Sequence, residues 1–366
     1  MHFPIKKFLV VLVVLGLTSC KLESDDNRKN NHDQSESVSD SGMNDTENSK
    51  KTLSLIRERG KVVCGISRIL QGFSSVDNGK WTGLDTDFCR AVAAAVLGSP
   101  DEVEYVSLSA NPLEKNLSQV ALGGVDILVG APMWEITRNF ADQAEIVVVN
   151  FYDDQGFMMH VSHDIINVKQ MDKASICVRS GSMEEIRVTD YFRRHRMGLE
   201  LLTFNSTSEM FAAYRASQCK AVTGQLSDLA MERLKISSNP AEHVIFPGNI
   251  AINPFGVAVK HKDPEWSNVV KWVHFAMIQA EEMEITSKNI DSLRAFRSLR
   301  GLFGTGGIPS KQLPLKTDWA YVVIKTIGNY GEVFYKNLGN GSAMRLDRYQ
   351  NDVWSKGGLH YAPSSL

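Results

Sequence analysis

Three stretches of the sequence carry residue types suited to holding a small zwitterion. Arg138 follows a strand expected at Ile127–Val129, and an arginine in a crevice can hold a carboxylate through two parallel charge-assisted hydrogen bonds. The turn Ser180-Gly181-Ser182 lies between an expected strand and an expected helix, so its amides would point at an anion at a helix N-terminus. Phe73 follows the first expected strand and would cover an apolar side chain. These residues predict a site that binds a ligand.

The motifs of common catalytic sites are missing from the sequence. It contains no Gly-x-Ser-x-Gly elbow, no phosphate loop ending in Gly-Lys-Ser or Gly-Lys-Thr, no His-Glu-x-x-His and no spaced zinc set. The Gly304–Gly307 cluster lacks the preceding strand of a dinucleotide site and is interpreted as a loop. Asp87 is interpreted as the N-cap of an Ala-rich helix rather than as half of a metal pair. We expect no catalytic residue, no metal and no cofactor.

Strands and helices alternate from Leu53 onward, which predicts an α/β protein with mainly parallel sheets and right-handed crossovers. The expected strands are Val62–Ile66, Val103–Leu108, Ile127–Val129, Ile146–Phe151, Phe157–His160, Ser175–Val178, Leu201–Phe204, Ala221–Thr223, His243–Phe246 and Phe255–Val259. The expected helices are Leu53–Arg59, Asp87–Leu97, Asn111–Leu122, Met183–His195, Ser208–Ser217, Ser227–Lys235 and Pro264–Met283.

Two strand runs, Ile146–His160 and Ile250–Val259, are expected to cross between two lobes. The chain would leave lobe 1 and return to it, so that residues 52–152 and 256–366 form lobe 1, which includes a C-terminal extension, and residues 153–255 form lobe 2. Ligands of such folds bind in the crevice at the carboxyl ends of the strands. We therefore expect the site between the lobes.

The first fifty residues have the composition of an export signal followed by a tether. Lys6 and Lys7 precede a short apolar stretch, which predicts a secretory signal peptide at residues 1–19, too short for a membrane span. The sequence Leu17-Thr18-Ser19-Cys20 resembles a bacterial lipobox, in which Cys20 would be lipidated. An ordinary signal peptide that contains a cysteine is the alternative. Residues 20–51 are polar and mildly acidic, and we expect them to be disordered.

An exported chain meets an oxidising compartment, so the four cysteines other than Cys20 are candidates for disulfides. Cys64 lies in an expected strand, and Cys89 lies near the start of the helix that follows. Cys177 and Cys219 repeat this arrangement in the second half of the chain. We expect Cys64–Cys89 and Cys177–Cys219, with four free thiols or a crossed pairing as the alternatives.

The overall composition limits the classes of partner. The 366 residues, 43% of them hydrophobic, are enough for two folded domains. A formal net charge of −2, with both signs scattered along the chain, argues against nucleic-acid binding, which needs a concentrated basic face.

The order of these elements resembles the polar-amino-acid class of bacterial ABC-transporter solute-binding proteins, and within it the larger general L-amino-acid-binding subgroup. The resemblance covers residues 52–366, and its most specific stretches are Leu53–Gly65, Trp81–Val92, Tyr152–Met158, the helix around Trp272, Asp318–Tyr321, Gly328–Phe334 and Trp354–Pro363. It implies a type II two-lobed venus-flytrap fold that closes on an amino acid and delivers it to a membrane permease. It also supports the pairing of cysteines within each lobe.

The resemblance assigns ligand contacts to Trp134, Arg138 and the Ser180–Ser182 turn, and it exposes two departures. Val129–Met133 stands where the family has a polar stretch, and Pro132 supplies no backbone donor. Gln225 stands where the family has an aspartate that pairs with the ligand ammonium. Bonds to charged groups contribute roughly 1.5–3 kcal/mol against about 1 for neutral ones. Two such losses would weaken amino-acid binding about a hundredfold.

The leading hypothesis is a monomeric, lipid-anchored solute-binding component of an amino-acid ABC transporter in the periplasm or cell envelope. A divergent surface lipoprotein on the same scaffold, with lost or altered ligand binding and with envelope or host partners, is the alternative. A third hypothesis, an enzyme acting on a carboxylate, requires an acid or base in the crevice, for which Glu135 is the nearest candidate.

Overall fold

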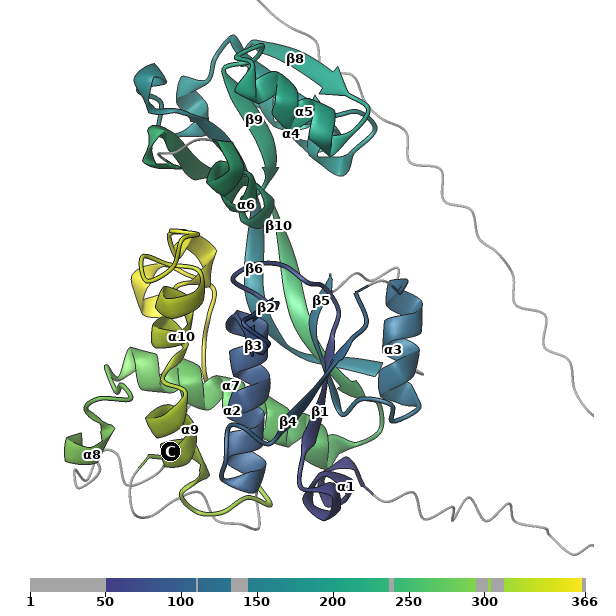
Figure 1. Ribbon diagram of the computed structural model, residues 1–366. Helices are drawn as coiled ribbons and strands as arrows, with labels where there is room; N and C mark the ends of the chain where they lie inside the picture. The colour runs from purple at the N-terminus through teal and green to yellow at the C-terminus, as the bar shows by residue number, and fades with distance from the viewer. Residues whose placement is uncertain are drawn as a thin grey trace, which may run out of the picture. The chain divides into compact units, whose positions relative to one another are not determined.

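The computed structural model describes residues 51–109, 111–132, 144–236, 240–293, 302–303 and 313–363 (Figure 1). Within these ranges, no helix combines the length and apolar character that crossing a membrane requires. The expected signal peptide, Cys20 and residues 21–50 of the expected tether lie outside them. The described residues form two lobes joined by a long antiparallel pair of strands, as the sequence predicted.

Lobe 1 is built on three parallel strands. Its elements are α1 (Thr52–Arg59), β1 (Val62–Ile66), β2 (Ser75–Asp77), β3 (Lys80–Thr82), α2 (Leu84–Leu97), β4 (Val103–Ser107), α3 (Leu113–Ala121), β5 (Ile127–Pro132), α7 (Pro264–Glu282), α8 (Ile290–Leu293), α9 (Trp319–Thr326), α10 (Tyr330–Asn337), η5 (Tyr349–Asn351) and η6 (Trp354–Lys356). β1 lies between β4 and β5, parallel to both. Successive β1 residues face opposite layers: Val62 packs in the cluster with α1, α2 and α7, and Val63 packs with α3. Both faces of the strand are therefore buried.

Lobe 2 repeats this plan on a smaller scale. Its elements are η1 (Val161–His163), η2 (Val168–Gln170), β7 (Ala174–Arg179), α4 (Met183–Arg194), β8 (Leu199–Phe204), α5 (Thr207–Arg215), β9 (Ala221–Gln225), α6 (Leu226–Ile236) and η3 (Pro240–Glu242). β7 lies between β8 and β9, parallel to both. Phe157 packs on the side of α4, and its neighbour Met158 packs on the side of α5.

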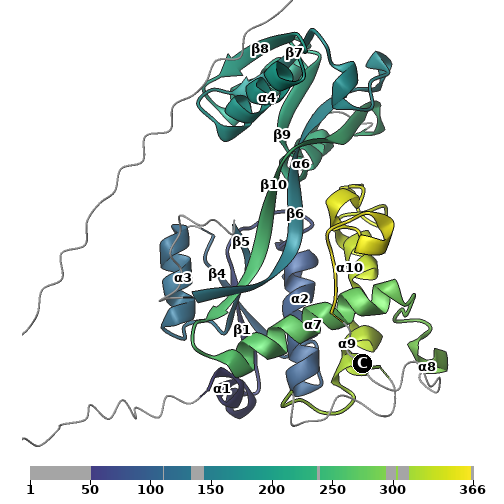
Figure 2. The ribbon, with the colours of Figure 1, turned by 180° about the vertical axis from the view of Figure 1, so that it is seen from behind.

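Two strands, β6 (Ala144–His160) and β10 (His243–Lys260), carry the chain between the lobes (Figures 1 and 2). They pair antiparallel from Ala144 opposite Lys260 to His160 opposite His243. β10 also pairs with β5 and β6 with β9, so the strand order is β4-β1-β5-β10-β6-β9-β7-β8. Each crossing joins what the sequence had indicated as two shorter strands.

The predicted cysteine pairing is confirmed. Cys64 on β1 is disulfide-bonded to Cys89 on α2, with Cα atoms 6.2 Å apart. Cys177 on β7 is disulfide-bonded to Cys219, with Cα atoms 5.8 Å apart. Each lobe therefore has one disulfide from its central strand, which ends on α2 in lobe 1 and on the loop after α5 in lobe 2.

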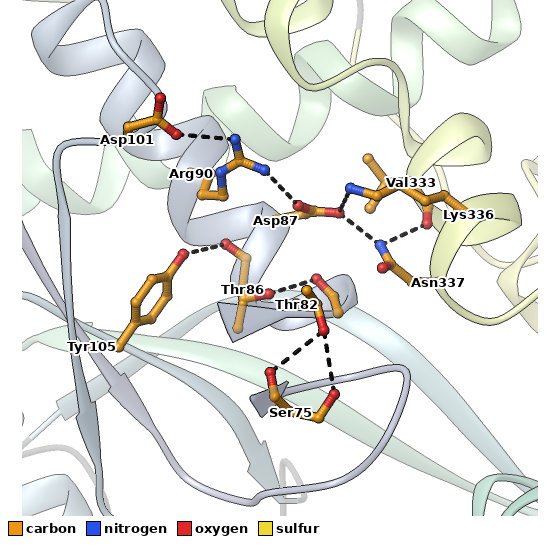
Figure 3. Close-up of polar contacts among 11 residues, drawn as sticks. Ser75, Thr82, Thr86, Asp87, Arg90, Asp101, Tyr105, Val333, Lys336 and Asn337 are labelled. Atoms are coloured by element: carbon orange, nitrogen blue, oxygen red, sulfur yellow. Dashed lines mark hydrogen bonds and ion pairs between the residues drawn. The ribbon is translucent and has the colours of Figure 1, made fainter. Parts of the chain in front are cut away.

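The predicted start of α2 at Asp87 is wrong. The helix begins at Leu84 after Gly83, whose φ of 128° and close approach to the carbonyl of Phe73 exclude a side chain. Asp87 therefore lies inside the first turn. Its carboxylate instead accepts hydrogen bonds from Asn337 Nδ2 (2.7 Å) and Lys336 Nζ (2.9 Å) of α10 (Figure 3).

The C-terminal extension, residues 318–363, packs against the crossing strands as well as against α2. Asn351 bonds to both backbone groups of Tyr152 on β6. Tyr349 donates its hydroxyl to the carbonyl of Ile245 on β10 (3.1 Å), and Arg233 of α6 donates to the carbonyl of Met344. The extension thereby contacts lobe 1, the crossings and α6 of lobe 2.

Candidate functional site

A polar hollow of about 160 Å³ lies at the carboxyl ends of β7 and β9 in lobe 2. It is lined by Arg179, Ser182, Glu184, Thr207, Met210, Phe211, Thr223, Gly224, Gln225 and Asp228. Parallel strands end here and the helices α4 and α6 begin, the position at which α/β sheets bind ligands. The structure therefore brings the predicted site residues Ser182 and Gln225 into one cavity.

The amides of the predicted anion-binding turn already have acceptors within the protein. The amide of Ser180 donates to the carbonyl of Phe204 (2.7 Å), and that of Gly181 donates to Oε2 of Glu185 (2.6 Å). Ser182 caps α4 by accepting from the amide of Glu185. In this structure the Ser180–Ser182 turn caps the N-terminus of α4. A contact between this turn and a ligand stays a prediction.

The acid side of the hollow consists of Glu184 and Asp228 beside Gln225. None of these three side chains forms a hydrogen bond with another described residue, so their oxygens are available to a ligand. Desolvation raises the pKa of the Asp228 carboxyl, and the positive charge of Arg68 in lobe 1 is the largest influence opposing this rise. Because Asp228 is exposed, water screens part of that interaction. Asp228 of α6, three residues after Gln225 at the end of β9, brings a carboxylate to the same hollow.

Arg68 lies two residues beyond β1, at the carboxyl end of the lobe 1 sheet. The amide of Ser67 donates to the carbonyl of Val129 and ties this loop to β5. The Arg68 guanidinium carbon lies 4.3 Å from the centre of the Phe73 ring and 3.8 Å from that of Phe255. A Cβ atom at Gly130, whose φ is 64°, would lie 2.8 Å from Oδ2 of Asp85 and 3.5 Å from Cγ of Arg68, so glycine is favoured here chiefly by the close approach of Asp85.

Two buried carboxylates feel the positive charge of Arg68 but have other hydrogen-bond partners. Asp85 accepts from Asn150 Nδ2 (3.1 Å), and burial raises its pKa while Arg68 opposes the rise. Asp153 accepts from both the amide and the hydroxyl of Ser227, at 3.1 and 2.5 Å. Burial raises the pKa of Asp153 to about 6 against the effect of these bonds and of Arg68.

Phe73 lies in the core of lobe 1 and not at the surface. Its ring is fully buried and meets Phe151 edge to face, with ring centres 4.8 Å apart. It therefore presents no free face to a solute in this structure and instead supports Arg68. Trp134, Arg138 and Glu135 lie outside the described residues, as does Met133, so their predicted roles stay predictions.

Sequence reasoning missed Arg68 and Asp228. A signal for Asp228 was present, since an acidic residue stands three positions after the departure at Gln225. Arg68 has only its position after the first strand. Among the residues that the structure describes, no group of three or more His, Cys, Asp or Glu side chains is placed to hold a metal ion.

Two α/β lobes, two crossing strands and polar groups at the strand ends of both lobes define a solute-binding protein of type II. No protein-family model matches the chain. It is 37% identical over 316 residues to a putative amino-acid ABC transporter-binding protein, YhdW, from Escherichia coli, covering 85% of this chain and 92% of the relative. It is also 37% identical to the general L-amino acid-binding periplasmic protein AapJ of Rhizobium johnstonii, covering 86% and 93%.

Among solved structures, an ABC-transporter periplasmic binding protein from Brucella ovis with glutathione bound aligns with a TM-score of 0.69 at 36% identity. The alignment covers 86% of this chain and 99% of that one. The chain therefore belongs to the family of amino-acid-binding proteins of ABC transporters. The alternative of a surface lipoprotein receives no support from these relatives.

Proposed function

We propose that the protein captures an amino acid between its lobes and delivers it to the permease of an ABC transporter. The observation that carries this proposal is the hollow at the strand ends of lobe 2, where the carboxylates of Glu184 and Asp228 have no hydrogen-bond partner among the described residues. An α-ammonium group is the cation that such a pair would hold in an amino acid. The names of the relatives AapJ and YhdW support an amino acid as the ligand class.

In this proposal the ligand is bound from both sides. The ammonium group is held by Asp228, Glu184 and Gln225 of lobe 2. The α-carboxylate is held by Arg138, with Trp134 and the Ser180–Ser182 turn completing the site. Closure occurs by bending of β6 and β10 between lobe 1 (residues 52–152 and 256–366) and lobe 2 (residues 153–255). The protein acts as a monomer and catalyses no reaction.

Thermal unfolding of the full chain with each amino acid tests the proposal. A ligand present at a hundred times its Kd stabilises a protein by about 2.7 kcal/mol, a clear rise in Tm. Asp228→Asn should weaken binding about tenfold, because a charge-assisted bond to the ammonium becomes a neutral one. Asp77→Asn makes the same change on the exposed β2 and should leave affinity unchanged. If no amino acid shifts the wild-type Tm, the proposed function is wrong.

We further propose that the mature chain begins at a lipidated Cys20 and resides in the periplasm, held at a membrane. Residues 20–51 then serve as a tether. Mass spectrometry of the N-terminal peptide should show the added acyl mass, and Cys20→Ala should move the protein to the soluble periplasmic fraction. An unmodified N-terminus downstream of Cys20 would refute the anchor and leave the binding proposal intact.

A further inference from the structure

The guanidinium group of Arg68 has donors without an acceptor. Its Nε and Nη2 atoms are buried, and neither forms a hydrogen bond with another described residue. Within the described ranges Arg68 also forms no ion pair at 4.0 Å or less. Buried polar groups in native proteins are bonded in the large majority of cases, and leaving a charged donor unbonded is costly. Among the residues that the structure describes, Arg68 therefore has the properties of a group that can take a further acceptor, such as a ligand.

A purely structural role, neutralising the buried acids nearby, does not account for this arrangement. Asp85 is bonded to Asn150, and Asp153 is bonded to Ser227. Neither carboxylate turns to the free guanidinium nitrogens, although both are close enough to sense the charge of Arg68. The third acid that senses this charge is Asp228, on the opposite lobe.

Two aromatic rings lie close to the guanidinium group of Arg68. The rings of Phe73 and Phe255, both buried, lie against it. Guanidinium groups stack on aromatic rings through their faces and donate through their edges, and the edge matches a carboxylate through two parallel bonds. The unbonded Nε and Nη2 atoms are the donors through which an anion would be bound.

We propose that Arg68 binds a second, side-chain carboxylate of the ligand, so that the protein prefers acidic amino acids to their uncharged amides. This inference rests on the proposed function, in which the α-carboxylate belongs to Arg138 and the ammonium group to the lobe 2 hollow. The Brucella ovis relative has glutathione bound, a molecule with two carboxylates. Arg68 is then a specificity-determining residue.

Isothermal titration of the full chain, purified in detergent, with L-glutamate and L-glutamine tests the inference. The two ligands have nearly the same shape and differ in one charge. The wild type should bind glutamate about tenfold or more tightly than glutamine, since a charge-assisted bond replaces a neutral one. Arg68→Gln should bring this ratio toward one, and Arg68→Lys should retain part of it.

The controls separate specificity from folding and from net charge. Arg193→Gln removes the same charge from the exposed face of α4 and should leave the ratio at its wild-type value. If Arg68→Gln leaves the ratio of glutamate to glutamine affinity unchanged, or lowers both affinities equally, the inference is wrong. Either result would mean that Arg68 does not interact with the second carboxylate. Equal binding of the two ligands by the wild type would also overturn it while leaving the proposed function standing. A wild type that binds no amino acid refutes both.

Discussion

Asn351 bonds to both backbone polar groups of Tyr152, accepting from its amide at 2.7 Å and donating to its carbonyl at 2.8 Å. One side chain thereby satisfies both backbone polar groups of a β6 residue, as a neighbouring strand would. Tyr152 lies next to the buried pair Asp153 and Asp154, close to the expected boundary between the lobes. The side chain of Asn351 therefore binds the C-terminal extension to the backbone of the crossing strand β6.

Replacing Asn351 by Ala should lower the free energy of unfolding by about 2 kcal/mol. Two backbone groups would lose their partners, and an unsatisfied buried polar group costs about 1–3 kcal/mol. Urea unfolding measures the change. Asn340→Ala removes the same side chain at an exposed position and should stay within about 0.5 kcal/mol of the wild type. Equal effects of both substitutions would show that the contact with Tyr152 contributes nothing specific.

The contact between α2 and α10 should depend on Asn337 more than on Lys336 (Figure 3). Both donate to Asp87, but Asn337 is buried and the Lys336 side chain is 61% exposed. We expect Asn337→Ala to destabilise by about 1.5–3 kcal/mol, because Asp87 is a charged acceptor. Lys336→Ala should cost about 1 kcal/mol or less, since water screens exposed ion pairs. Chemical unfolding of the two variants side by side decides the order, and a larger effect of Lys336→Ala would contradict it.

The buried histidines predict loss of stability in acid. Burial lowers the pKa of His274 to about 4, and the pKa of the adjacent His360 is lowered too, by burial first and then by the charge of His274. A lowered pKa in the folded state means that stability is complete above the unfolded pKa near 6.5 and declines as pH falls toward 4. For His274 the loss is on the order of 3 kcal/mol. When the free energy of unfolding is measured against pH, His274→Phe should show a smaller decline between pH 6.5 and 4 than the wild type. His163→Gln, on the surface, should decline as the wild type does.

The buried carboxyl group of Asp154 should make the protein less stable as the pH rises, the opposite direction to the effect of the histidines. Burial raises its pKa to about 7, against the hydrogen bond from the amide of Asn249, and its Oδ1 atom is buried without a partner. Because the raised pKa favours the protonated folded form, its contribution is complete below pH 4 and is lost as pH rises through 7.

Asp154→Asn should therefore be more stable than the wild type at pH 8 and should gain little at pH 4. Calorimetric Tm values across this range provide the measurement. Asp164→Asn, the same change in an exposed turn, should follow the wild-type profile. A variant less stable than the wild type at pH 8 would show that the ionised carboxylate is needed there.

Local sequence patterns were sufficient for the elements whose formation depends on nearby residues. The apolar run Val62–Ile66 forms β1 with the predicted bounds, and both cysteine pairs form as predicted, each between a strand and a residue in or just after a helix. The crossings β6 and β10 were also predicted, because long β-rich runs interrupt the helix–strand alternation. The start of α2 was misplaced, since Gly83 is required by a contact with Phe73 that the local pattern does not reveal. The hairpin of β2 and β3 and the helices α8 to α10 were not predicted.

The residues of the candidate site also fall into two groups: those that the sequence predicted and those that only the tertiary structure reveals. Ser182 and Gln225 lie at the ends of strands, a position that alternation and resemblance predict, and the structure places both in one hollow. Arg68 can be recognised as a candidate site residue only from its tertiary contacts. Its guanidinium group lies against Phe255, nearly two hundred residues later, and the nearby acids are bonded to other residues. Burial and hydrogen-bond satisfaction depend on which distant segments meet. Sequence thus determined where polar groups stand along the chain, and tertiary structure decided which of them remain free to bind.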